Sequence, residues 1–318
     1  MTEIAVGIKN LIRDFGDVRA IDDISLTIPS GIIFGLLGPN GAGKSTIIKT
    51  LYGLLPPSSG SATVLGYDTR TDIDEIRRRS GALFANDSLY DHLTAEENLD
   101  YQGRIWRLSE SERRQRMQEL LVPLGLWERR GEVVGGWSRG MKRRLAIART
   151  LFHRPRVLFM DEPSAGLDPA AAAKLHDDLL SMAENEGVTI VLATHNLVEA
   201  EQLCTQIAVL RAGRLVTVAP TADLRSEGGT PMLEITGSGF SEDVVALLAR
   251  RREVAGIESK IDRLLVELRA ADVHTWPLVS LLVESGADVE EVHKFQSSLA
   301  DVFLHMISDE GAAVNSAP

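Results

Sequence analysis

The chain has 318 residues, of which 44% are hydrophobic and 25% charged, the composition of a core-forming protein of about two domains. No apolar stretch approaches the ~18–20 residues that a membrane-spanning helix requires, and a single cysteine, Cys204, excludes an internal disulfide. The net charge is −11, and 15 acidic but only 7 basic residues fall in the range 231–318, which counts against nucleic acid as the main ligand.

The segment Met1-Thr2-Glu3 lacks the basic and apolar regions of a signal peptide. Together with the cysteine content, this predicts a protein of a reducing, cytosolic compartment. The chain is expected neither to span nor to cross a membrane on its own.

Up to about residue 225, short apolar runs alternate with segments of helical periodicity. Ile32–Leu37, Val157–Met160 and Thr189–Ala193 are predicted to be buried parallel strands, and Glu110–Leu124 and Ala170–Asn185 to be helices. This alternation predicts an α/β core.

A glycine-rich loop follows the first strand and fits the pattern G-x-x-x-x-G-K-[ST]. Its residues are Gly38, Pro39, Asn40, Gly41, Ala42, Gly43, Lys44 and Ser45, and a helix is predicted over Thr46–Leu54. Backbone N–H groups in such a loop surround a phosphate, and the helix N-terminus adds partial positive charge. Lys44 is expected to reach the β- and γ-phosphates, and Ser45 to ligate Mg²⁺. A glycine-rich turn that binds nothing is the alternative.

Further along the chain, Ser138 and Gly140 begin a second predicted helix that could receive an anion at its N-terminus. The strand Val157–Met160 then ends in two acids, which a parallel sheet would place at its ligand-binding edge. Asp161 is expected to hold Mg²⁺, and Glu162 to polarise the water that attacks the γ-phosphate. Taken alone, such an acidic pair is also a turn signal.

These segments resemble the ABC ATPase family over residues 4 to about 225. Trp137-Ser138-Arg139-Gly140-Met141 is similar to its L-S-G-G-Q signature, and Ser164–Asp168 is similar to its D-loop. Thr194-His195, at the end of a strand, looks like the switch histidine. Phe15 looks like the aromatic residue that stacks on adenine, although a buried core aromatic is the alternative. The resemblance implies a P-loop NTPase of the ABC ATPase type.

In that family, two ATP molecules are sandwiched in a head-to-tail dimer. The resemblance implies that Ser138 and Gly140 contact the nucleotide of the partner subunit, and that Asp168 belongs to the nucleotide-binding set. It also implies a hydrogen bond from His195 to the γ-phosphate. The basic run Lys142-Arg143-Arg144 is interpreted as a solvated helix face.

The chain departs from the family pattern at two places. Arg139 replaces the first signature glycine, and activity is expected to survive this change. Ala85 stands where the Q-loop usually supplies a glutamine to Mg²⁺. Either Asn86 ligates the metal instead, or a water does so, or the contact is lost.

A linker composition at Ser226–Pro231 separates the ATPase domain, residues 1–225, from a second domain at 232–310 and a disordered tail at 311–318. The second domain reads as β-α-β-β-α-β, which predicts a small ferredoxin-like fold with a regulatory or dimer-stabilising role. A short helix is predicted over Leu299–Ile307. The ending Ser298–Leu304 looks like that of ATPases from ABC-2 type exporters.

The resemblance therefore implies an ATP- and Mg²⁺-dependent ATPase subunit of an ABC-2 type exporter, peripheral on the inner face of the cell membrane. Its expected partners are a transmembrane permease and a second ATPase subunit, with a homodimer favoured. One alternative is a soluble ABC-type ATPase that never meets a membrane subunit. Another is a nucleotide-binding regulator without turnover, which the missing Q-loop glutamine would favour.

Overall fold

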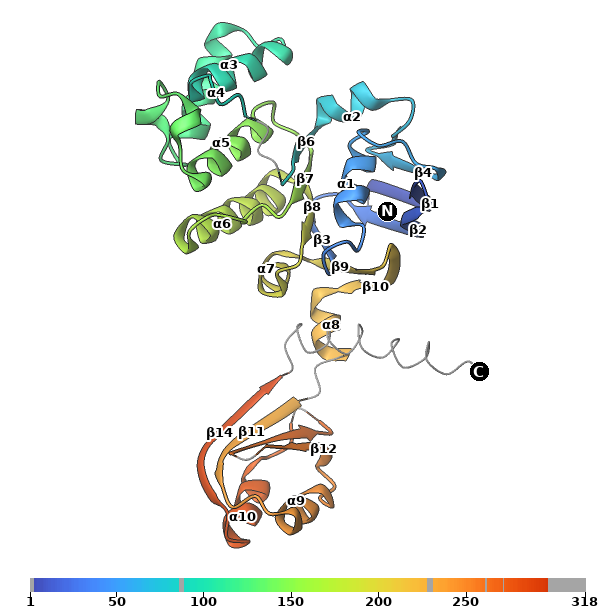
Figure 1. Cartoon of the computed structure of the whole chain (residues 1–318), viewed down its shortest axis with the longest axis vertical. Helices are drawn as coiled ribbons and strands as arrows, with labels where there is room; N and C mark the ends of the chain where they lie inside the picture. The colour runs from blue at the N-terminus through green and yellow to red at the C-terminus, as the bar shows by residue number, and fades with distance from the viewer. Residues whose placement is uncertain (1–2, 86–88, 228–230, 261, 271, 297–318) are drawn as a thin grey trace. The chain divides into compact units, whose positions relative to one another are not determined.

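The computed structural model of the chain describes residues 3–85, 89–227, 231–260, 262–270 and 272–296. The chain divides after Ala219 into two compact units, which are described separately (Figure 1). No helix within these described stretches is long and apolar enough to span a membrane.

The first unit contains a six-stranded sheet. Its strands are β3 (Ile33–Leu37), β6 (Ser80–Leu83), β7 (Val157–Asp161), β8 (Thr189–Thr194), β9 (Gln206–Arg211) and β10 (Arg214–Pro220). They lie in the order β10-β9-β3-β8-β7-β6, and the pairs from β9 to β6 are parallel. Every residue of β3, β7 and β8 is buried, as expected for strands that are covered on both faces. The predicted α/β core is confirmed.

A second sheet of the same unit was not anticipated from the sequence. It consists of β1 (Ile4–Phe15), β2 (Val18–Pro29), β4 (Ser59–Val64) and β5 (Tyr67–Asp68), in the order β2-β1-β4-β5 with antiparallel pairing. The register shifts repeatedly between β1 and its neighbours. Such bulges interrupt the alternation of apolar and polar residues that would have indicated a strand.

Helix α1 (Lys44–Leu51) lies in the core that joins the two sheets. Its buried Ile47 and Ile48 belong to the same cluster as Ile24 of β2 and Phe159 of β7. The sequence predicted that this helix continues to Leu54. It ends earlier because Gly53 adopts a left-handed conformation with φ of 71°.

The remaining helices of this unit are α2 (Ile73–Arg79), α3 (Ala95–Ile105), α4 (Glu110–Leu121), α5 (Arg139–Leu151), α6 (Pro169–Glu186) and α7 (Leu197–Leu203). Some of them lie against the sheets, and α3, α4 and α5 form a group of their own (Figure 1). Thr94 and Ser109 begin α3 and α4 with capping boxes. Helix α4 ends three residues before the predicted Leu124 because Pro123 has no backbone N–H with which to continue the helical hydrogen bonds.

The second unit begins with α8 (Thr221–Glu227) and has the predicted β-α-β-β-α-β order. Its elements are β11 (Pro231–Ser238), α9 (Glu242–Ala249), β12 (Val254–Ser259), β13 (Arg263–Leu268), α10 (Trp276–Glu284) and β14 (Asp288–Gln296). The strands form an antiparallel sheet in the order β12-β13-β11-β14. Leu233, Val266, Leu248 and Leu282 pack its sheet against its two helices. The predicted helix at Leu299–Ile307 lies outside the described residues.

Candidate active site

A cavity of about 220 Å³ opens at the carboxyl ends of β3, β6 and β7, where the loops that follow these strands meet. It is lined by Ala20, Asn40, Gly41, Ala42, Gly43, Lys44, Ser45, Thr46, Ala85, Asp161 and Glu162. A larger cavity of about 490 Å³ lies among α4, α5 and α6, but it is lined by a mixture of aliphatic and charged side chains and not by the phosphate-type loop. The smaller cavity is the candidate site because it alone of the two combines a phosphate-type loop with carboxylates.

The loop between β3 and α1 can adopt its shape only with glycines at critical positions. Gly43 caps α1 with φ of 101°, and a Cβ there would lie 2.6 Å from the carbonyl oxygen of Ala20. A Cβ on Gly38 would lie 2.4 Å from the carbonyl oxygen of Leu210. Close backbone packing on both sides therefore fixes the path of the loop.

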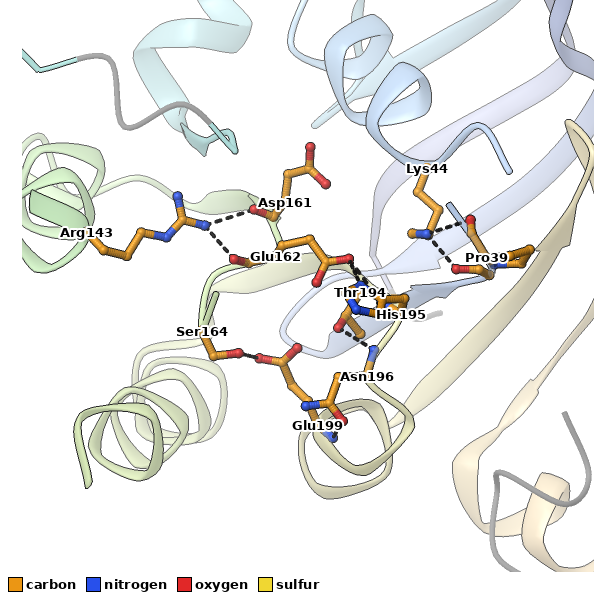
Figure 2. A network of polar contacts seen from close by, with 11 residues as sticks. Pro39, Lys44, Arg143, Asp161, Glu162, Ser164, Thr194, His195, Asn196 and Glu199 are labelled. Carbon is orange, nitrogen blue, oxygen red and sulfur yellow. Dashed lines mark hydrogen bonds and ion pairs between the residues drawn. The ribbon is translucent and has the colours of Figure 1, made fainter. Parts of the chain in front are cut away.

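Lys44 extends back along this loop and is 6% exposed. Its Nζ donates hydrogen bonds to the carbonyl oxygens of Gly38, at 2.5 Å, and Pro39, at 3.0 Å (Figure 2). Burial lowers the pKa of Lys44, and the nearby carboxylates of Glu162 and Asp161 oppose that shift. An anion bound within the loop would stabilise the charged form of this ammonium group.

Asp161 and Glu162 point in different directions although they are adjacent (Figure 2). Asp161 is the last residue of β7 and is 4% exposed. Glu162 has a left-handed backbone, with φ of 52°, and its N–H donates to the carbonyl oxygen of Ala193 at 2.9 Å. Its Oε1 accepts hydrogen bonds from the backbone N–H of His195 at 3.1 Å and from Nδ1 of the same residue at 2.7 Å. The two expected catalytic residues are therefore in direct contact.

Arg143 corrects the interpretation of the basic run as a solvated face. It is 3% exposed, and its guanidinium donates to the carbonyl oxygens of Phe84, Asp161, Glu162 and Pro163 at distances between 2.6 and 3.0 Å. The side chain joins α5 to the ends of β6 and β7. Its helical spacing from the buried Ile147 was a signal that the sequence interpretation did not use.

The other members of the run also have partners. Nζ of Lys142 lies 2.9 Å from Oδ1 of Asp91, and the Arg144 guanidinium donates to the carbonyl oxygen of Leu124 at 2.9 Å. Lys142 and Arg144 are both only partly exposed. The three basic side chains therefore connect α5 to neighbouring segments of the chain.

The remaining predicted residues lie away from this cavity. Ser138 and Asp168 accept hydrogen bonds at the N-termini of α5 and α6, from Met141 and Ala171. Neither residue lines the cavity, and Gly140 does not line it either. Their expected role on a partner's nucleotide stays a prediction.

Phe15 and the Q-loop complete the set of predicted positions. Phe15 is 44% exposed at the end of β1, so it is not a core aromatic, and the Arg13 guanidinium lies 4.6 Å from its ring centroid. Ala85 lines the cavity opposite the phosphate-type loop. Asn86 lies outside the described residues.

Comparison with known proteins adds three findings. A family model described as ABC transporter matches residues 21–165. The daunorubicin resistance ATP-binding protein DrrA3 of Streptomyces coeruleorubidus is 33% identical over 314 residues, 98% of this chain and 98% of its own length. The Nod factor export ATP-binding protein I of Rhizobium johnstonii is 38% identical over 260 residues, 80% of this chain and 83% of its own length.

Among solved structures, a dimeric ATP-binding cassette in a post-hydrolysis state, bound to ADP and Pi, matches with a TM-score of 0.63 at 28% identity. The match covers 68% of this chain and 98% of that chain. The expected fold class, a P-loop NTPase core with an added α+β unit, is therefore confirmed.

Proposed function

This chain belongs to the ABC transporter family of ATP-binding proteins, and we propose that it powers an ABC-2 type exporter through a separate transmembrane permease. The family assignment supports an ATP-binding and ATP-hydrolysing subunit, and a dimeric solved relative supports dimerisation; a membrane permease would be the further partner. The names of two relatives, one for daunorubicin resistance and one for Nod factor export, support export as the direction of transport. The subunit would then lie peripherally on the inner face of the membrane.

The residues of the cavity account for phosphate and metal binding in this proposal. Lys44 and the N–H groups of the loop would hold the β- and γ-phosphates. Ser45 and Asp161 present a hydroxyl and a carboxylate to the same small cavity, and these are oxygen donors of the kind that Mg²⁺ prefers. When bound there, the metal would neutralise charge on the phosphate oxygens.

The contact between Glu162 and His195 is the observation that carries the catalytic assignment. Glu162 lines the cavity, and its carboxylate faces the switch histidine at the end of the neighbouring strand. Glu162 would accept a proton from the attacking water while His195 bonds the γ-phosphate. Ser138, Gly140 and Asp168 would act on the nucleotide of the second subunit, and Phe15 would stack on adenine.

An exposed aromatic surface supports a docking site for the permease. Tyr90 and Tyr101 are 42% and 48% exposed, and their ring centroids lie 5.3 Å apart. Ile105 continues this surface along α3 with 52% exposure. The adjacent Asp91 forms an ion pair with Lys142 of α5, the helix that Ser138 begins. A displacement of this surface on binding of the permease would therefore be transmitted to α5.

The experiment that tests the proposal compares the wild type with Glu162→Gln. With ATP and Mg²⁺, the wild type is expected to release phosphate, whereas the variant should lose about a hundredfold or more of its turnover and accumulate as an ATP-loaded dimer. Phosphate release and size-exclusion chromatography measure the two effects. Glu184→Gln, an exposed change on α6, is the matched control and should behave as the wild type.

A Glu162→Gln variant that turns over at the wild-type rate would remove Glu162 from the role of base. For the exporter assignment, co-purification with an ABC-2 type permease and stimulation of its transport by ATP is the decisive measurement. Transport that is unaffected by loss of this subunit would argue against it and would revive the alternative of a family member without a membrane partner.

A further inference from the structure

Glu199 is a buried carboxylate that the proposed reaction does not use. It lies on α7 and is 1% exposed. Its Oε1 accepts a hydrogen bond from the Ser164 hydroxyl (Figure 2). The same oxygen lies 3.3 Å from Nε2 of His176. Its Oε2 has no hydrogen-bond partner among the described residues. Both contacts therefore converge on one oxygen of the carboxylate.

This contact joins the same two chain segments as the contact between Glu162 and His195. Ser164 follows Glu162 by two residues in the loop after β7, and Glu199 of α7 follows His195 by four residues after β8. The loop after β7 is thus joined twice to the segment that follows β8. The outer contact, between Glu162 and His195, is exposed, whereas the inner contact, between Ser164 and Glu199, is part-buried and Glu199 itself is 1% exposed.

Stability does not explain the inner contact. Burial of a carboxylate carries a desolvation penalty, and an unpaired oxygen adds to that penalty. A neutral side chain of the same shape would avoid part of it. Glu199 also does not line the candidate cavity, so it has no direct contact with a nucleotide bound there.

We propose that Glu199 is a positioning residue, which fixes the loop after β7 to the start of α7, the helix that follows β8, so that Glu162 and His195 address the same γ-phosphate. The charged acceptor matters because a hydrogen bond to a carboxylate is roughly twice as strong as one to a neutral group. The inference rests on the proposed roles of Glu162 and His195. The contact between Ser164 and Glu199, called the brace below, would set the separation of Glu162 and His195.

The experiment uses the full-length chain and compares Glu199→Gln, Ser164→Ala and the double variant with the wild type. Each single change is expected to lower kcat by about fivefold to tenfold and to leave the KM for ATP within about twofold, because the phosphate loop is untouched. Glu199→Gln should leave Tm unchanged or raise it. The double variant should be no slower than the slower single variant, because both changes break one contact. Glu184→Gln again serves as the control.

A second measurement does not depend on turnover. The backbone N–H of His195 is bonded to Glu162, so its hydrogen exchange reports the outer contact in the absence of nucleotide. Exchange at His195 is expected to become about fivefold faster in Glu199→Gln and in Ser164→Ala.

Unchanged exchange in both variants would overturn the inference, whatever the activity of the wild type. A fall in kcat that is matched by a fall in Tm would reduce Glu199 to a structural role, and additive losses in the double variant would show that the two side chains act separately. Absence of phosphate release by the wild type itself would instead count against the proposed function, while the exchange measurement would still decide on the brace.

Discussion

The Phe15 ring is partly exposed and has a cationic neighbour. The Arg13 guanidinium lies over the ring, 4.6 Å from its centroid, an arrangement that is stabilised by attraction between the cation and the π-electrons. The ring is nevertheless 44% exposed. The exposed part of the ring would be the part that stacks on a purine.

Replacement of this ring tests the proposed adenine contact. Phe15→Ala is expected to weaken ATP binding by about fivefold to tenfold, since stacking between a base and an aromatic ring contributes about 1–3 kcal/mol and part of the exposed ring's contribution is lost to solvent. The effect should appear in KM, with kcat nearly unchanged. Val18→Ala is the control, because Val18 is 66% exposed at the same hairpin. Equal KM values for all three proteins would show that adenine is held elsewhere.

The role of a residue could be predicted when its partners are its neighbours in the sequence. It could not be predicted when the partners are brought together only by the fold. The phosphate-type loop is one contiguous segment, so its pattern alone pointed to Lys44 and Ser45, which both line the cavity. Arg143 has backbone partners from two separate strand ends, and Glu199 meets Ser164 only after β7 and β8 pair. Charge alone suggested a solvent-exposed position for Arg143. The fold instead made it a buried donor.

The side chain of Arg143 connects helix α5 to the end of strand β7. Arg143 supplies hydrogen bonds to consecutive carbonyl oxygens at the end of β7 and to one at the end of β6. Phe84, Glu162 and Pro163 lie beyond the ends of these strands, whereas Asp161 is the last residue of β7, and the carbonyl oxygen of Glu162 also accepts a hydrogen bond from the N–H of Ala165. The guanidinium therefore completes backbone hydrogen bonding at the point where both strands end.

Arg143→Gln is expected to lower the free energy of unfolding of the ATPase unit by about 2–4 kcal/mol, because several buried carbonyl groups lose their donor. Arg143→Lys should fall between this variant and the wild type, since one ammonium group cannot reach all four acceptors. Denaturant titration measures the loss. Arg114→Gln, on the exposed side of α4, provides the comparison and should be close to neutral. A neutral result for Arg143→Gln would mean that water replaces the guanidinium.

Helices and strands whose apolar residues follow a regular period were predicted well. Strands in which bulges interrupt that period were missed. The buried strands β3, β7 and β8 and the long helix α6 lie within one or two residues of their expected bounds. The β-α-β-β-α-β order of the second unit was also predicted, because its apolar runs are separated by turn residues. The antiparallel sheet that begins with β1 was not predicted, since bulges disrupt its alternation.

At the scale of the whole molecule, the candidate active site belongs to one unit. Every residue that lines the cavity lies between Ala20 and Glu162, and each unit has its own hydrophobic cluster. A chain that ends at Glu227 should therefore retain the affinity for ATP of the full chain within about twofold. Equilibrium binding of a fluorescent ATP analogue measures this. Loss of binding despite a folded ATPase unit would assign the second unit a part in the nucleotide site.

The same truncation separates binding from assembly. If the second unit stabilises the dimer, one of the two roles expected for a domain without a motif for chemistry, the shortened chain should need a higher protein concentration to dimerise with ATP. Light scattering on the Glu162→Gln background measures that shift. Identical dimerisation of both chains would leave regulation as the remaining role.

The contact between Glu162 and His195 has a consequence for how the proposed reaction would respond to mutation. The proposed base and the proposed ligand of the γ-phosphate share hydrogen bonds, because Oε1 of Glu162 accepts from both the backbone N–H and Nδ1 of His195. A change at either side chain would therefore alter the surroundings of both, and the two residues would act as one unit.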